Sequence, residues 1–421
     1  MTLMHSPSPE PRPTDTALLE LEDWLLDCAL RDVSIRELVG GLVARLLAAG
    51  IPIARFNIGF DTLHPLYEGV GYTWRQETGI EEVVFTELMG HGSPQWQDSP
   101  FHWLYEKQLP TLRRRLAGDG ALLDFPLLEE FAASGGTDYL GAMVPFVTDA
   151  ESAIGTNEIF MSFMTKRAGG FTDADLTGLR TLLRSIAVAC KMRISHQETR
   201  TILSTYLGLG AGREVRDGRI KRGDGKKLEA VIWFSDLRGS VGLGRGISEE
   251  AYLKEINAYF DCAGGAVLDA GGEILRFVGD AALAVFPIPD GDVPQICRRA
   301  LGAVTEAERR LAELNAQRQS AGRPPFRQGV GLHVGTVLYG NVGVGSRLEF
   351  TVIGSAANEA ARIADAAKRC ERVLMVSESF ARHGGDFLVR VGEFELKGYE
   401  KPFTLYAPVD DGRCPSVETS L

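Results

Sequence analysis

Two aspartates in the second half of the chain lie where strand-like runs end. Asp236 closes the apolar run that starts at residue 231, and Asp280 lies in the two-residue turn between the runs 275–278 and 281–286. If these runs are neighbouring strands, the two carboxylates converge at one edge of a sheet. Paired carboxylates suit Mg²⁺, which binds a few protein carboxylates together with phosphate oxygens. Taken singly, each aspartate is explained more simply as a turn residue.

A glycine-rich segment directly follows Asp236 and includes Arg238, Gly239 and Ser240. Because glycine lets backbone N–H groups approach a phosphate closely, this segment predicts a phosphate-binding turn beside the carboxylates. The alternative is an ordinary mobile loop.

A third pattern joins a strand, residues 348–353, to an alanine-rich helix, residues 355–370. Asn358 and Arg362 are four residues apart on that helix and therefore share one face. An amide and a guanidinium on one stripe fit a sugar and a phosphate group. By itself, the pattern is explained more simply as a solvated polar face.

The elements that would position these groups follow a regular order. Strand patterns at 228–234, 272–278, 281–286 and 327–334 alternate with helical patterns at 248–269 and 292–321. This β-α-β-β-α-β order is that of a ferredoxin-like fold, and the Gly279-Asp280 turn is typical of a hairpin. A further short strand is predicted at 336–339, and short strands continue to residue 408.

The first half of the chain predicts an α+β domain. Helices are expected from residue 15 and over 34–50, where Ser34 and Glu37 form a capping box. Strands are expected over 53–60, 82–88, 140–147 and 158–165. A long helix capped by Thr172 and Asp175 follows, with a coiled-coil-like seam at Leu176, Leu179, Leu183, Ile186 and Cys190.

Composition and charge exclude several classes of protein. The 421 residues carry 45 Lys and Arg against 56 Asp and Glu, a net charge of −11, which argues against a nucleic-acid binder. The most apolar stretch, residues 38–54, contains Arg45 and Pro52, so we expect no membrane span. The N-terminus lacks signal-peptide features and the six cysteines are scattered, so we expect a cytoplasmic protein.

Five stretches together resemble the catalytic domain of class III nucleotidyl cyclases. They are WFSDLRGS at 233–240, GGEILRFVGD at 271–280, GLHVG at 331–335, FTVIGSAANEAAR at 350–362 and ELKGY at 395–399. The first half resembles the GAF-like domain that precedes such cyclases in bacteria, by its layout and by residues 64–74. The resemblance implies an α+β protein: a ferredoxin-like cyclase domain behind a GAF-like domain and a helical linker.

The resemblance divides the chain into five segments. These are a flexible tail (1–14), a GAF-like regulatory domain ending in the long helix (15–198), a linker (199–226), the cyclase catalytic domain (227–410) and a second tail (411–421). A GAF-like domain either binds a small molecule or only dimerises, and the sequence leaves both open.

The resemblance also implies roles for individual residues. Asp236, Asp280 and the backbone carbonyl of Leu237 would hold two Mg²⁺ or Mn²⁺ ions. Asn358 would position the ribose of ATP, and Arg362 would stabilise charge on the α-phosphate. The remaining substrate-binding residues would be Lys397, at the leaving phosphates, and Arg238, Gly239 and Ser240.

By the same resemblance, Arg276 and Thr351 would select the base of the nucleotide. Guanine-selective relatives place Glu at the first of these positions, and Arg276 cannot accept a hydrogen bond as Glu would. We therefore expect adenine. The chain departs from the family pattern in having Arg rather than Lys at 276, and Ser240 and Val241 where Phe and Thr are usual.

The resemblance finally implies a head-to-tail homodimer with composite sites. One subunit would give Asp236 and Asp280 and the other Arg276, Thr351, Asn358, Arg362 and Lys397, while the seam 176–190 would hold the pair together. The leading hypothesis is a regulated adenylate cyclase that makes cyclic AMP from ATP. The alternatives are a guanylate cyclase and a catalytically inactive, nucleotide-binding signalling module.

Overall fold

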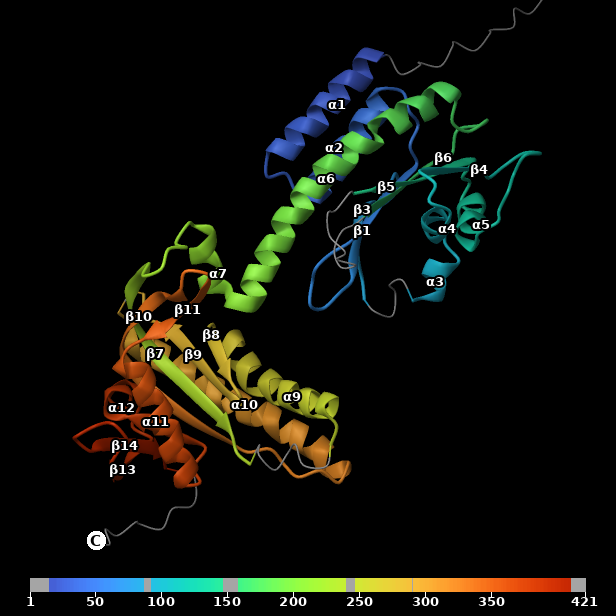
Figure 1. Cartoon of the computed structure of the whole chain (residues 1–421). Coiled ribbons are helices and arrows are strands. Elements are labelled where there is room, and N and C mark those ends of the chain that lie inside the picture. Colours follow the sequence, from blue (N-terminus) through green and yellow to red (C-terminus); the bar gives the residue numbers. More distant parts are fainter. Residues whose placement is uncertain (1–14, 87–91, 147–157, 240–246, 290, 410–421) are drawn as a thin grey trace, which may run out of the picture. The chain divides into compact units, whose positions relative to one another are not determined.

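The computed structural model describes residues 15–86, 92–146, 158–239, 247–289 and 291–409. The tails predicted at 1–14 and 411–421 lie outside the described residues. The chain divides into two compact units, residues 1–202 and 203–421 (Figure 1). None of the helices in the described ranges combines the length and the apolar character needed to cross a membrane.

The first unit is built on a six-stranded sheet of order β3-β2-β1-β6-β5-β4, in which every neighbouring pair is antiparallel. Its strands are β1 (Arg55–Asp61), β2 (Gly69–Arg75), β3 (Gly79–Phe85), β4 (Thr111–Arg115), β5 (Asp138–Pro145) and β6 (Glu158–Thr165). Its helices are α1 (Asp15–Leu30), α2 (Ile35–Ala48), α3 (Pro94–Gln97), α4 (Pro100–Lys107), α5 (Pro126–Ala133) and α6 (Asp173–Leu207), of which α6 runs past the unit boundary at residue 202. The predicted α+β architecture is confirmed, and the GAF-like assignment stays a prediction.

Helices cover both faces of this sheet. Side chains of α1, α2 and α6 pack with β1 and β6 in the largest buried cluster, and α4 and α5 pack on the other face against β5 and β6. The predicted capping box at the start of α2 is present, because Glu37 N–H donates to Ser34 Oγ and Ser34 N–H donates to the Glu37 carboxylate. The predicted cap of α6 is also present, since Asp175 N–H donates to Thr172 Oγ1.

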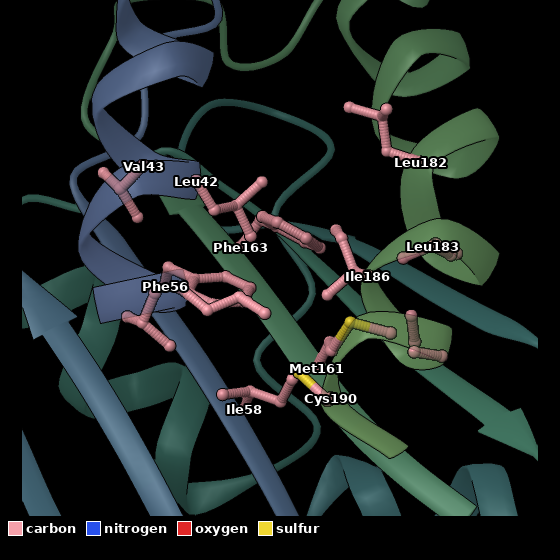
Figure 2. Close-up of a cluster of buried hydrophobic side chains, with 14 of the residues drawn as sticks. Leu42, Val43, Phe56, Ile58, Met161, Phe163, Leu182, Leu183, Ile186 and Cys190 are labelled. Carbon is pink, nitrogen blue, oxygen red and sulfur yellow. The ribbon is translucent and has the colours of Figure 1, made fainter. Parts of the chain in front are cut away.

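The seam on α6 has a different role from the predicted one. All of its members are buried in the core of the first unit: Leu176, Leu179, Leu183, Ile186 and Cys190. Figure 2 shows Leu183, Ile186 and Cys190 facing Phe163 and Met161 of β6. The prediction that this seam holds two subunits together is therefore wrong, because the same 3-and-4 spacing serves a helix that packs on its own sheet.

The second unit contains the predicted ferredoxin-like order. It begins with α7 (Leu209–Arg216) and continues through β7 (Gly225–Leu237), α9 (Glu249–Asp269), β8 (Glu273–Val278), β9 (Ala281–Pro287), α10 (Val293–Ser320) and β10 (Gln328–Val344). In the sheet, the four core strands lie in the order β10-β7-β9-β8. The β8–β9 hairpin therefore lies beside the first strand of the motif, β7, as predicted, and the last strand, β10, lies on the other side of β7.

Further elements extend this core. They are β11 (Arg347–Ile353), α11 (Ser355–Arg369), β12 (Leu374–Ser377), α12 (Glu378–Gly384), β13 (Leu388–Phe394) and β14 (Phe403–Pro408). Buried side chains of α10 pack with Val231 and Trp233 on one face of β7, and those of α11 pack with Ile232 on the opposite face. The alternation of side chains along β7 thus builds both cores.

One strand boundary differs from the prediction. The sequence predicted separate strands at 327–334 and 336–339, divided at Gly335, but β10 is continuous from Gln328 to Val344. Gly335 is needed for a close approach, because a Cβ there would lie 2.7 Å from the Cβ of Ala356 on α11. Gly331 has the same role, since a Cβ there would clash with the carbonyl oxygen of Ala360. The two glycines therefore let α11 pack tightly on β10.

Candidate active site

Asp236 and Asp280 lie next to one another at one end of the sheet. Asp236 is the penultimate residue of β7 and pairs in register with Ala281 of β9, directly after Asp280. The backbone N–H of Leu237 donates to the carbonyl oxygen of Asp280 at 3.3 Å. Gly279 adopts a φ of 64°, which the first position of a II′ hairpin turn requires. The predicted convergence of the two residues is thus observed.

The environment of Asp236 is partly desolvated and rich in charge. Burial raises the pKa of this carboxyl and the charge of Asp280 adds to the rise, while a hydrogen bond from Lys368 opposes it. Lys368 Nζ lies 2.8 Å from Asp236 Oδ2. Two neighbouring carboxylates that repel one another in a half-buried site favour a bound cation.

The donor set at this end of the sheet fits Mg²⁺ or Mn²⁺. Two carboxylates and a backbone carbonyl are hard oxygen ligands, and Mg²⁺ commonly takes one or two carboxylates plus substrate phosphates. The site therefore fits ions that arrive with phosphate oxygens.

The segment after Asp236 is anchored by Arg238. Its backbone N–H donates to the carbonyl of Arg327 at 2.8 Å, and its guanidinium donates to the carbonyl oxygens of Ala367, at 3.1 Å, and Arg372. The side chain thus ties the end of β7 to the end of α11. Gly239 is exposed with a φ of 78°, and Ser240 lies outside the described residues.

A pocket of about 400 Å³ gathers three of the predicted substrate-binding residues. Arg276 of β8, Thr351 of β11 and Asn358 of α11 all line it. Glu349 lines the same pocket, and its carboxylate lies 3.1 Å from Nε of Arg276. Sequence reasoning missed Glu349, although alternation along a strand places it on the same face of β11 as Thr351.

A second cavity, of about 700 Å³, brings together Arg362 and Lys397. Lys368 and Arg369 also line it, so cations gather at the C-terminal half of α11. The guanidinium of Arg362 lies 3.2 Å from the carboxylate of Asp365, one turn further along the helix. Five cationic side chains line this cavity in all, against three acidic ones, Asp365, Glu395 and Glu400, so its net charge is positive, as a site for phosphate groups requires.

Within one chain the predicted residues therefore form three separate groups: Asp236 with Asp280, Arg276 with Thr351 and Asn358, and Arg362 with Lys397. Helix α11 passes all three. Asn358 lies in the first turn of the helix and Lys368, which contacts Asp236, in the last. Ten residues of helix correspond to about 15 Å. Neither Asp236 nor Asp280 lines either of the two cavities.

The second unit matches a known protein family. The model of the adenylate and guanylate cyclase catalytic domain matches residues 225–407. An adenylate cyclase of Anabaena cylindrica is 32% identical over 192 residues, which are 44% of this chain and 38% of that protein. The chain thus spans well under half the length of this relative.

Two solved structures are also similar to this chain. The adenylyl cyclase CyaB from P. aeruginosa is 25% identical, with a TM-score of 0.40 and coverage of 45% of this chain and 97% of that chain. The guanylyl cyclase Cya2 is 27% identical, with a TM-score of 0.38 and coverage of 43% and 92%. From the family match and the related sequence, residues 225–407 are a class III adenylate/guanylate cyclase catalytic domain.

Proposed function

We propose that the chain is an adenylate cyclase that converts ATP to 3′,5′-cyclic AMP and pyrophosphate, under the control of its N-terminal unit. The observation that carries this proposal is the pairing of Asp236 and Asp280 on adjacent strands, in a domain whose Arg276, Thr351 and Asn358 share one pocket. An inactive binding module has no need for the paired carboxylates.

In this proposal the side chains of Asp236 and Asp280 and the carbonyl of Leu237 hold two Mg²⁺ or Mn²⁺ ions. Such ions lower the pKa of the attacking ribose 3′-hydroxyl and neutralise charge on the phosphates. Asn358 orients the ribose through its amide. Arg362 donates hydrogen bonds to the α-phosphate oxygens, where negative charge grows during the attack, and Lys397 binds the departing pyrophosphate.

The site is proposed to form between two copies of the chain. A ribose held by Asn358 needs metal ions within a few ångströms of its 3′-hydroxyl, whereas Asn358 and the Lys368–Asp236 contact lie toward opposite ends of α11. A head-to-tail pair supplies the missing half, because each Asp236–Asp280 pair then faces the pocket of the other copy. Two equivalent sites result from the two-fold symmetry.

Adenine is the proposed base. The guanidinium of Arg276 can donate to adenine N1, an acceptor, and the Thr351 hydroxyl can accept from the exocyclic amine. Glu349 is the observation that favours a second candidate, a guanylate cyclase, since its carboxylate could accept from the N1–H and exocyclic amine of guanine. Its ion pair with Arg276 offsets part of this acceptor strength.

A product assay tests the proposal. The purified full chain is incubated with ATP or GTP and with Mg²⁺ or Mn²⁺, and the products are separated by chromatography, with Asn358→Ala as the matched control. We expect cyclic AMP from the wild-type chain and a higher kcat/KM for ATP than for GTP. A higher kcat/KM for GTP would select the guanylate cyclase, and no product from either nucleotide would select the inactive module.

A further inference from the structure

Helices α1 and α6 of the first unit lie side by side and run in the same direction. Leu18 packs over Gly178, Ser185 Oγ donates to the carboxylate of Glu22 at 2.6 Å, and Asp32, just beyond α1, pairs with Arg193. Residues later in the first segment contact residues later in α6, so the two helices are parallel (Figure 1). The same contacts show which residues lie at the same height along the two helices.

Both helices carry an exposed apolar stripe beside this contact. On α1 the stripe consists of Leu19, Leu26 and Leu30, and Leu26 and Leu30 are 45% and 86% exposed. On α6 it consists of Val188 and Met192, which are 46% and 47% exposed. Scattered exposed leucines are ordinary, but these five apolar side chains lie on two adjoining helices, at spacings of four and seven residues that keep them on one face of each helix.

The two stripes face the same side of the unit. At about 100° per residue, Leu26 lies about 40° beyond Glu22 around α1, on the side of Glu22 away from the buried Leu25. By the same count, Val188 lies beyond Ser185 on the side of α6 opposite to the buried Ile186. The stripes therefore flank the α1–α6 contact on its outer side, away from the core, and we name them together the outer face.

The charges that border the outer face differ between the two helices. Helix α1 has no Lys or Arg, and the exposed Asp23 borders its stripe. The exposed Arg184 borders the stripe of α6, one turn before Val188. The surface is thus acidic along one edge and basic along the other, which is the pattern of a face that complements a copy of itself.

We propose that the outer face docks a second copy of this chain about a two-fold axis parallel to the helices, so that α1 of each copy packs against α6 of the other. Ser185 lies level with Glu22, so Leu26 and Leu30 meet the partner's Val188 and the partner's Met192. Asp23 then lies opposite the partner's Arg184. This interface rests on the proposed function, because composite sites need two copies, and it replaces the buried seam as the contact between the N-terminal units.

Site-specific crosslinking of the full chain tests the interface. Leu26→Cys in a chain with one affinity tag is mixed with Val188→Cys in a chain with another, allowed to exchange subunits, and oxidised mildly. The matched control replaces Leu26→Cys by Glu20→Cys, an exposed position of α1 on the side away from the stripe. We expect a dimer carrying both tags at least tenfold more often for the 26–188 pair than for the control.

A second experiment tests the apolar contact and the pairing of charges across the interface separately. Leu26→Glu is expected to raise the dimer dissociation constant of the full chain at least tenfold, about 1.4 kcal/mol. Asp23→Arg and Arg184→Asp should each raise it severalfold, and the double variant should restore it. These side chains are exposed, so circular dichroism should show unchanged helix content.

The outcomes separate this interface from the proposed function. Equal crosslinking of the 26–188 pair and the control, in a chain that is dimeric by sedimentation, would overturn the interface and leave cyclic-nucleotide production standing. A chain that is monomeric by sedimentation would overturn it too. A 26–188 crosslink in a chain that makes no cyclic nucleotide would refute the activity and retain the interface.

Discussion

Lys368 and Asp236 form an ion pair within the second unit, with 2.8 Å between the ammonium nitrogen and a carboxylate oxygen. The contact joins the end of α11 to the end of β7, and it raises the pKa of Lys368. The positive charge lies where the proposed metal ions would bind. Lys368 therefore balances part of the charge of the two aspartates and competes with a cation for them.

Removing either aspartate should abolish turnover. Asp236→Asn and Asp280→Asn keep the size of the side chain and lose its charge, so we expect initial rates at least about 10³-fold lower, corresponding to about 4 kcal/mol of lost transition-state stabilisation. The control is Glu378→Gln, an exposed acid paired within α12. Near-normal rates in either aspartate variant, measured with Mn²⁺, would refute the metal assignment.

Removing the competing ammonium should tighten metal binding. We expect Lys368→Gln to lower the dissociation constant for Mn²⁺ severalfold in the absence of nucleotide, about 1 kcal/mol for a half-exposed ion pair. Electron paramagnetic resonance of free Mn²⁺ measures this without activity. The control is Lys401→Gln, a second lysine that lines the same cavity as Lys368. Unchanged or weaker binding in Lys368→Gln would contradict the competition.

Base selection should respond to the ion pair between Arg276 and Glu349. Glu349→Gln removes the carboxylate acceptor, so we expect the ratio of kcat/KM for ATP to that for GTP to rise about tenfold. Arg276→Lys should keep the preference for ATP with an altered KM. A ratio that falls in Glu349→Gln would show that the carboxylate serves adenine instead.

Much of the catalytic domain was predictable because its signals are local. The Gly279-Asp280 turn and the apolar runs around it are sufficient to predict the β8–β9 hairpin, and the β-α-β-β-α-β order then places Asp280 near Asp236. Gly335 was misinterpreted because a glycine that permits close helix packing and one that ends a strand look alike in sequence. Only the partner, Ala356, distinguishes them.

Two features depended on tertiary contacts. The spacing of Leu176 to Cys190 is the same for a coiled coil and for a helix lying on its own sheet, and the sequence does not state which partner is present. Glu349 pairs with Arg276 from a different hairpin, far away in the sequence.

Strands β2 and β4 were not predicted either. Gly69 and Gly71 interrupt the apolar pattern of β2, and three of the five residues of β4 are arginine.

Stability should fall below neutral pH because of His333. Burial lowers the pKa of this imidazole from 6.5 to about 4, while Nε2 lies 3.2 Å from the carboxylate of Glu359. The unfolded chain therefore takes up a proton on His333 before the folded chain does. The resulting stability is fully present above pH 6.5 and is lost as the pH falls toward 4, by up to about 3 kcal/mol.

Urea unfolding of the full chain at pH 7 and pH 5, followed by circular dichroism, measures this loss. His333→Asn retains a polar side chain that does not titrate, so its stability should change less between the two pH values than that of the wild type. An equal change in both proteins would show that His333 does not carry the effect.

The central claim is a cyclase whose active sites are shared between two chains, and subunit complementation tests it most directly. Asp236→Ala and Asn358→Ala should each be inactive alone. Mixed and allowed to exchange, they form heterodimers with one doubly damaged site and one intact site, so activity should return to about half of the wild-type rate per heterodimer. If activity does not return although tagged subunits show exchange, the site lies within one chain and the shared-site model is wrong.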